Sequence, residues 1–363
     1  SFKKENQKYI IRNISLVKID AVLNASLVFL LGIGSIVILW IGGQHIISGQ
    51  ISFGQIVALI SYVAILARPM EAVGYLLIMW QKAITATQRV QQMLNHPPDI
   101  ADNELTNHTI KSLDGRLVFE NVSYTYTGAQ EETLKDISFS ANQGQTIAIV
   151  GSTGSGKSTL IHLLPRLIEP SSGAIRFGGH ELSTIPLQVL RRNMGVVQQE
   201  SFLFSESLSG NIAFGVADVD DAIIAKATEI SQLQLDVDQF PDGLETVIGE
   251  RGITLSGGQK QRTSISRAVI RKPALLILDD ALSAVDTYTE EEILRQIRPI
   301  MKECTTIIVA HRISTIRDAN LILVLDGGTI VERGTHDELV NNSGLYFKMH
   351  ERQRLEDTLL DIS

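Results

Sequence analysis

The chain has 363 residues, 44% of them hydrophobic and 20% charged, which excludes general disorder and allows two or three domains with apolar cores. The net charge of −8 argues against a nucleic-acid partner, which usually meets a basic protein surface. The single cysteine, Cys304, excludes a disulfide within the chain, fits a reducing cytosol, and is expected to be a small buried residue.

The first apolar run predicts a membrane span. Residues 21–41 contain no charged side chain, and about 20 apolar residues are needed to cross a bilayer as a helix. Trp40 stands near one end, where an interfacial aromatic residue is expected. The alternative is a buried helix of a soluble protein, but such helices are rarely this long and uncharged. The run is also too long for a signal peptide, and since the chain begins at Ser1 we expect a fragment of a longer protein.

A second apolar stretch follows a short glycine-containing turn over residues 42–52. We expect a span over residues 53–80 and a cytosolic continuation of the same helix to residue 95, where Pro97 and Pro98 follow. Such a helix would be about 60 Å long at 1.5 Å per residue, roughly twice the hydrocarbon thickness.

Charged residues set the orientation of the two spans. Cationic side chains precede the first span and follow the second, whereas His45 is the only titratable side chain in the connecting loop. The positive-inside rule therefore places both ends in the cytoplasm. Within the second stretch, Arg68 and Glu71 can share one helix face. Either they are solvated at the cytosolic interface, or Glu71 faces the translocation pathway and favours cationic substrates.

Residues 97–115 are rich in Pro, Asp and Asn and are interpreted as a linker. After it, short β-like runs alternate with helical ones, which predicts an α/β domain with a largely parallel sheet. We assign this domain to residues 116–351, with a helical subdomain over about 200–272, and treat residues 352–363 as a tail.

A phosphate-binding loop is the strongest local motif. It matches G-x-x-x-x-G-K-[ST] between an apolar strand and a helical run. Glycines let backbone N–H groups approach phosphate oxygens, the lysine adds a charge at the β/γ-phosphates, and the final serine offers its hydroxyl to Mg²⁺. The expected ATP contacts are Gly151, Ser152, Thr153, Gly154, Ser155, Gly156, Lys157, Ser158 and Thr159.

Two carboxylates end a second apolar strand, ALLILDD, at residues 274–280. In open α/β sheets ligands bind at the carboxyl ends of strands. Asp279 is therefore expected to hold Mg²⁺, directly or through water, and Asp280 to orient or deprotonate a water.

The run Leu255 to Gln259, LSGGQ, resembles the signature motif of ABC ATPases. Gly257 and Gly258 have no side chains to cover the backbone N–H groups at the start of a helix, which again favours binding of an anion. The resemblance implies that Ser256, Gly257, Gly258 and Gln259 contact a nucleotide held by a second ATPase domain.

Other motifs of this family match in order. Tyr126, in VSYTYTG, resembles the aromatic residue that stacks on adenine, with Tyr124 as the competing choice. Gln199, in VVQQESFLF, resembles the Q-loop glutamine that contacts Mg²⁺ and senses the membrane domain, with Gln198 as the alternative.

Three further positions complete the resemblance. Glu250 resembles the acidic residue near the coupling helices, and residues 283–286 resemble the D-loop between the two ATP sites. His311, in IIVAHRIS, resembles the switch histidine at the γ-phosphate. The resemblance thus implies catalytic roles for Asp280, His311 and Gln199, and a metal site at Ser158, Gln199 and Asp279.

The resemblance covers nearly the whole chain. Residues 1–96 look like the last two of six helices in an ABC exporter half-transporter, and residues 116–351 look like one P-loop nucleotide-binding domain. This implies an ATPase of the bacterial cytoplasmic membrane that exports amphiphilic small molecules, with ATP and Mg²⁺ as cofactors. The expected partners are the lipid bilayer and a second half-transporter.

One position departs from the family pattern. The residue after Asp279 is usually Glu, the general base, but here it is Asp280, which is shorter by one methylene. Together with an intact LSGGQ, this resembles the degenerate-site subunit of heterodimeric multidrug exporters. The alternatives are a homodimeric lipid or peptide exporter and, more remotely, a soluble ABC ATPase, which the uncharged span disfavours.

Overall fold

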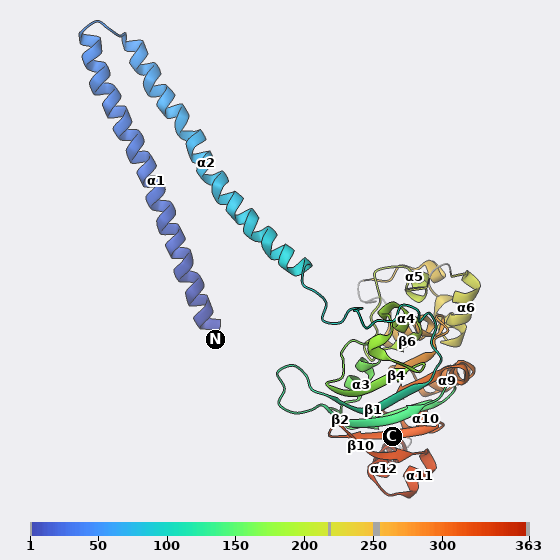
Figure 1. The fold of residues 1–363 in the computed structure, drawn as a ribbon. Helices are drawn as coiled ribbons and strands as arrows, with labels where there is room; N and C mark the ends of the chain where they lie inside the picture. The colour runs from blue at the N-terminus through green and yellow to red at the C-terminus, as the bar shows by residue number, and fades with distance from the viewer. Residues whose placement is uncertain (1, 217–218, 250–254, 361–363) are drawn as a thin grey trace. The chain divides into compact units, whose positions relative to one another are not determined.

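The computed structural model describes residues 2–216, 219–249 and 255–360. The chain divides into two compact units, Ser1–Pro97 and Pro98–Ser363. The first unit is a pair of long helices, and the second is an α/β domain (Figure 1).

The first unit consists of α1 (Phe2–Ile47) and α2 (Phe53–Leu94). Ser52 begins α2 and its N–H donates to the side chain of Gln55 over 2.8 Å. Near the connection, Gly42 is buried against Ile56, and a Cβ at position 42 would lie 2.6 Å from Ile56 Cδ1. The glycine therefore allows the two helices to approach closely there.

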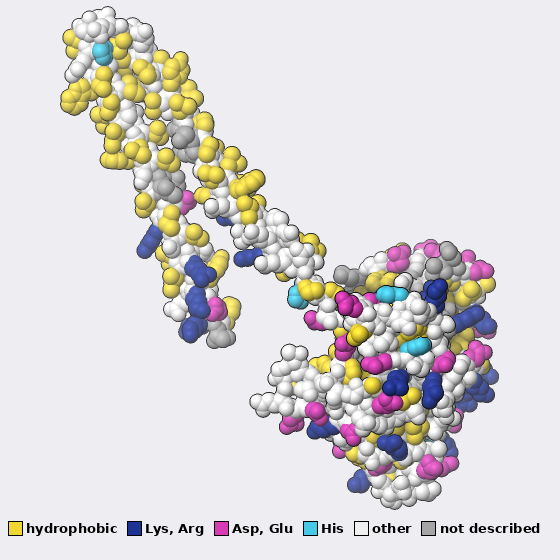
Figure 2. Space-filling view, in the orientation of Figure 1, with side chains coloured by type: hydrophobic (Ala, Val, Ile, Leu, Met, Phe, Trp, Pro, Cys, Tyr) yellow, Lys and Arg dark blue, Asp and Glu magenta, His cyan; other side chains and the backbone are white. Residues whose placement is uncertain are grey.

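Apolar side chains cover both helices, and Lys and Arg gather at the N-terminal end of α1 (Figure 2). Among the described residues, α1 is the helix long and apolar enough to span a membrane, whereas the apolar part of α2, Phe53–Leu66, is shorter. The backbone of α2 nevertheless continues as one helix through Pro69 to Leu94. Arg68 is exposed, and the side chain of Glu71 lies outside the described residues.

The second unit is built on a six-stranded sheet of order β10-β9-β3-β8-β7-β6. Five of its strands are parallel and β10 is antiparallel to β9. Their bounds are β3 (Thr146–Gly151), β6 (Met194–Val197), β7 (Leu275–Asp279), β8 (Thr305–Val309), β9 (Leu321–Asp326) and β10 (Thr329–Gly334). Strand β7 is buried throughout because alternate residues enter different cores: Leu275 and Ile277 enter one, Leu276 and Leu278 the other.

A four-stranded antiparallel sheet of order β2-β1-β4-β5 completes the β structure. Its strands are β1 (Leu117–Tyr124), β2 (Leu134–Ala141), β4 (Ser172–Phe177) and β5 (His180–Glu181). Helix α3 (Lys157–Leu163) follows β3 and packs in the core shared with this sheet, where Leu160 and Leu163 lie with Phe119 and Phe177.

The remaining helices are short, apart from α8, α9 and α12. They are α4 (Leu187–Arg192), α5 (Leu208–Ile212), α6 (Asp221–Ile230), α7 (Gln234–Val237), α8 (Gly257–Val269), α9 (Thr287–Glu303), α10 (Ile313–Ile316), α11 (His336–Asn341) and α12 (Leu345–Leu360). Single 3₁₀ turns occupy Leu182–Thr184 and Gly243–Glu245. Between β6 and β7, the described regular structure is helical apart from an isolated bridge between Ser207 and Val247.

Two segments differ from the expected linker and tail. Ile110 and Leu113 are buried in the core of the α/β unit, and the carboxylate of Asp102 accepts a hydrogen bond from the N–H of Leu187. Residues 352–360 continue α12 as helix. Apolar residues at 110 and 113 were the available sign that the linker packs on the domain. Cys304 is 1% exposed, as expected, and burial raises the pKa of its thiol.

Candidate nucleotide-binding site

The phosphate loop joins β3 to α3. Gly154 and Gly156 have φ angles of +82° and +104°, values that residues with a Cβ rarely adopt. A Cβ at Gly156 would also lie 2.7 Å from Leu134 Cδ2, so this position has no room for a side chain. A Cβ at Gly154 would meet nothing within 4 Å, which leaves its backbone open to the adjoining cavity.

Lys157 reaches back across this loop. Its Nζ donates hydrogen bonds to the carbonyl oxygens of Gly151 and Ser152, each over 2.9 Å. Burial lowers the pKa of Lys157, while the carboxylates of Asp280 and Asp279 act in the opposite direction. The ammonium group therefore remains close to both the loop and the carboxylates, where it can meet an anionic phosphate.

A cavity of about 270 Å³ lies beside the loop and collects most of the residues expected from the sequence. It is lined by Thr133, Thr153, Gly154, Gly156, Lys157, Ser158, Thr159, Gln199, Asp279, Asp280, Val309 and His311. Ser155 is buried beneath the loop, and its hydroxyl has no hydrogen-bond partner among the described residues. Strand ends and loops that are distant in sequence thus form one polar pocket.

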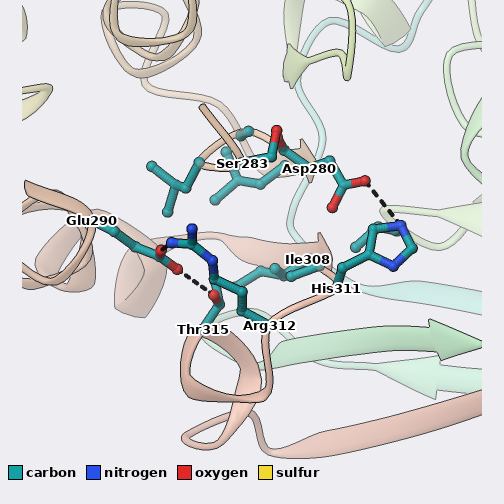
Figure 3. Close-up of a pocket in the computed structure, with 12 residues that line it drawn as sticks. Asp280, Ser283, Glu290, Ile308, His311, Arg312 and Thr315 are labelled. Atoms are coloured by element: carbon teal, nitrogen blue, oxygen red, sulfur yellow. Dashed lines mark hydrogen bonds and ion pairs between the residues drawn. The ribbon is translucent and has the colours of Figure 1, made fainter. Parts of the chain in front are cut away.

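Three side chains, those of Asp280, Gln199 and His311, meet at the carboxyl end of β7. The Nε2 of Gln199 donates to Oδ2 of Asp280 over 3.4 Å, and the Nε2 of His311 lies 3.2 Å from the same oxygen. Asp280 is 7% exposed, and its φ is +46°, a left-handed conformation that costs energy for a residue with a Cβ. The ring of His311 points toward this carboxylate (Figure 3). The three expected catalytic residues therefore lie together.

Asp279 lies at the end of the same strand. Burial raises the pKa of Asp279, and the neighbouring charge of Asp280 raises it further. A divalent cation would relieve this crowding of negative charge. Ser158, Gln199 and Asp279 line the cavity with oxygen-bearing side chains, the ligand type that Mg²⁺ prefers, so these residues fit the expected metal.

Tyr126 lies at the edge of the phosphate loop. Its hydroxyl is 3.1 Å from Oγ1 of Thr159, and the residue is 43% exposed. Its ring meets that of Tyr124 edge to face, with centroids 4.8 Å apart. Tyr124 is the less exposed of the two and ends β1, so Tyr126 has the ring face more available for a base.

The signature residues begin α8. The hydroxyl of Ser256 accepts a hydrogen bond from the N–H of Gln259, and the side-chain oxygen of Gln259 accepts one from the N–H of Ser256. The amide nitrogen of Gln259 also donates to Asp236 over 2.8 Å. A Cβ at Gly258 would lie 3.0 Å from the carbonyl oxygen of Ala284, so α8 begins against the D-loop. The cavity beside the phosphate loop is lined by other described residues, and the signature residues Ser256 to Gln259 are not among them.

Sequence patterns alone left two buried polar residues without a role. Gln261 is 4% exposed and contacts the carbonyl oxygen of Asp280, just after β7, and the D-loop residue Ser283. Glu290 is 3% exposed on the first turn of α9. The only sequence signal for such a residue is a polar side chain at a position that the helical pattern predicts to be buried. This signal does not identify the residue's hydrogen-bond partner. Glu250 lies outside the described residues.

Two family models match the chain. One, described as ABC transporter, covers residues 134–283, and the other, ABC transporter transmembrane region, covers residues 1–70. The two matches follow the predicted order of a helical membrane region and then an α/β ATP-binding domain, and so confirm the predicted fold class.

The chain is also similar to named bacterial proteins. It is 40% identical to a probable multidrug resistance ABC transporter ATP-binding/permease protein, YheI, of Bacillus subtilis, over 95% of this chain and 58% of the relative. It is 38% identical to an ATP-dependent lipid A-core flippase of Alkalilimnicola ehrlichii, over 87% of this chain and 54% of the relative.

A solved structure shares the fold. The structure of a bacterial Atm1-family ABC exporter with ATP bound matches with a TM-score of 0.74 and 34% identity, over 84% of this chain and 53% of that chain. The chain therefore spans a little more than half the length of the proteins it matches.

Proposed function

Because this chain belongs to the ABC transporter family, we propose that it forms part of a half-transporter that couples ATP binding and hydrolysis to export across the bacterial cytoplasmic membrane. The observation that carries the proposal is the convergence of Gln199 and His311 on Asp280, in a cavity shared with Lys157. The apolar α1 on the same chain links this site to a membrane.

Several side chains in and beside the cavity have proposed roles in holding MgATP. Lys157 leaves the carbonyl oxygens of its own loop and contacts the β/γ-phosphates, where a charge-assisted bond is stronger than the bonds it gives up. The exposed ring face of Tyr126 stacks on adenine. Ser158, Gln199 and Asp279 hold Mg²⁺, which supplies charge neutralisation at the phosphates.

Asp280 and His311 act where water attacks the terminal phosphate. In this proposal Asp280 orients or deprotonates that water, and His311 contacts the γ-phosphate. The carboxylate of Asp280 is one methylene shorter than the Glu expected here, and it is already engaged by both Gln199 and His311. We therefore propose that this site binds MgATP but hydrolyses it slowly.

The signature residues serve a second chain. Ser256 to Gln259 are held by α8 and Asp236, apart from the phosphate loop of their own chain. We propose that they complete the ATP site of a second half-transporter, which differs from this chain by a Glu at the base position. Amphiphilic compounds are the proposed substrates, since one relative is named a multidrug resistance transporter and another a lipid A-core flippase.

Steady-state ATP hydrolysis by the purified transporter in lipid tests this division of labour. Asp280→Asn should change turnover little, because Asp280 contributes little as a base. Ser256→Ala or Gly257→Asp should remove most activity, although neither residue touches this chain's own nucleotide. Asp318→Asn, an exposed carboxylate on the same domain, is the matched control.

A positioned general base contributes about 10²–10⁴-fold to a rate. A hundredfold loss in Asp280→Asn, or full activity of the chain as a homodimer, would contradict the asymmetric proposal. Either result would favour the alternative, a homodimeric lipid or peptide exporter with two equivalent sites.

A further inference from the structure

Glu290 is a buried carboxylate that the nucleotide cavity does not use. It is 3% exposed and lies on the first turn of α9, where its N–H donates to the carbonyl oxygen of Asp286 over 2.9 Å. Asp286 caps α9 and is the last residue of the D-loop. Burying a carboxylate is costly unless it is paired and hydrogen-bonded, so its partners indicate its role.

Both oxygens of the Glu290 carboxylate accept hydrogen bonds from one segment, residues 312–315. Arg312 donates from Nη1 to Oε2 over 2.5 Å, and the hydroxyl of Thr315 donates to Oε1 (Figure 3). The two donors stand on either side of the start of α10, the four-residue helix that follows β8. Glu290 therefore joins the helix after the D-loop to the loop that holds His311.

His311 and Arg312 are consecutive but point in opposite directions. The imidazole of His311 points to Asp280, whereas the guanidinium of Arg312 points to Glu290 (Figure 3). With Arg312 and Thr315 both held, the backbone that carries His311 has little freedom to turn. The N–H of Ile313 provides a second attachment, since it donates to Oε1 of Gln353 on α12 over 2.9 Å.

We propose that Glu290 is a positioning residue for His311: it fixes the imidazole over the nucleotide cavity by holding Arg312 and Thr315 from α9. The inference rests on the proposed function, because His311 acts there on the terminal phosphate. It also makes the D-loop and the histidine loop move together, since Asp286 and Glu290 share one helical turn.

The charge of Glu290 is central to this role. A glutamine has one acceptor oxygen in place of two, and its amide group would face one of the two donors. Glu290→Gln should therefore release either Arg312 or Thr315 while it preserves size and burial. Glu291→Gln, the exposed neighbour on the same helix, makes the same chemical change without these contacts and is the matched control.

The test is single-turnover ATP hydrolysis by the full-length transporter in lipid, together with its affinity for MgATP. One product per site suffices in this assay, so a slow site is still measured. With enzyme in excess over ATP, we expect Glu290→Gln to lower the rate constant of the slow phase, which belongs to this chain's site, about tenfold and to change affinity less than twofold. We expect His311→Ala to lower the rate at least as much, and the double variant to be no slower than His311→Ala, because residues that act as one unit are not additive.

The outcomes separate the inference from the proposed function. If Lys157→Ala binds MgATP at this chain's site as tightly as the wild type does, or the wild type does not bind MgATP there, the proposed function fails. If Lys157→Ala behaves as expected, then additive losses in the double variant, an equal loss in Glu291→Gln, or an unchanged rate in Glu290→Gln or in His311→Ala overturn the role of Glu290.

Discussion

The side-chain amide of Gln261, on α8, donates a hydrogen bond to the backbone carbonyl oxygen of Asp280 over 3.2 Å. The same nitrogen donates to the hydroxyl of Ser283 over 2.9 Å, and the side-chain oxygen accepts from the N–H of Ala284, also over 2.9 Å. One buried side chain thus joins the signature helix to the left-handed residue at the end of β7 and to the D-loop.

Replacing Gln261 with Leu should destabilise the ATP-binding domain and slow hydrolysis. The substitution removes the three hydrogen bonds that Gln261 makes to Asp280, Ser283 and Ala284, and a typical hydrogen bond contributes about 0.5–1.5 kcal/mol net. We expect a lower thermal unfolding midpoint and lower ATPase activity. Gln296→Leu, which removes only a hydrogen bond to Glu292 on α9, should change neither. Equal effects of the two variants would show that Gln261 has no special role.

Lys157→Ala should weaken nucleotide binding and abolish transport. Hydrogen bonds to charged groups contribute about 1.5–3 kcal/mol, which corresponds to roughly 10- to 150-fold in affinity. Titration with a fluorescent ATP analogue in the presence of Mg²⁺ measures the loss. Lys111→Ala, an exposed lysine of the same unit, is the control. Unchanged drug efflux in Lys157→Ala would contradict the proposed role.

Tyr126 provides a test of adenine recognition. Tyr126→Ala removes the stacking face, and stacking of a base on an aromatic ring contributes about 1–3 kcal/mol. Tyr126→Phe removes only the hydrogen bond to Thr159 and should bind ATP almost as well as the wild type. Comparing affinities for ATP and for inorganic triphosphate isolates the effect, because only ATP carries the base. If Tyr124→Ala, and not Tyr126→Ala, weakens ATP binding, the assignment is wrong.

Asp279 gives a pH dependence of defined sign. Its pKa is raised in the folded domain by burial and by Asp280, so the folded state favours the protonated form. As pH rises from below the ordinary aspartate pKa, the unfolded chain loses its proton first. The ligand-free domain therefore loses stability as pH increases through the raised pKa.

Asp279→Asn should remove this loss. Without nucleotide or Mg²⁺, the thermal midpoint of the variant should rise above that of the wild type as pH increases from about 4 to 8, and the difference should be smallest at the acid end. Asp99→Asn, at an exposed position, should show no such trend. A difference that grows toward acid pH would contradict the assigned direction.

The sequence predicted the order of the elements well because the signals were local and strong. An uncharged run predicts a long helix, and α1 forms over it; the phosphate loop and the buried strand ending in Asp279 lie where their patterns placed them. The C-terminal extension of α2 was also predicted, because few residues in its helical pattern interrupt the helix before Pro97.

Contacts between distant residues could not be predicted in the same way. Nothing in the sequence around Glu290 indicates that it meets Arg312 and Thr315, 22 and 25 positions later. The contact depends on how α9 packs against β8 and the loop that follows it, which the local sequence does not determine. The packing of Ile110 and Leu113 was missed for a related reason: a Pro- and Asn-rich composition describes a segment's conformation, but it does not say what covers it.

The cap of α8 also restricts which residue can stand at position 256. In accepting from the N–H of Gln259, the hydroxyl of Ser256 uses a lone pair, and its proton remains free to be donated. Aspartate caps helices as well as serine does, but it has no proton to give and would repel an anion. A helix start alone would accept either residue; a helix start that also presents a donor to another chain's phosphate excludes aspartate.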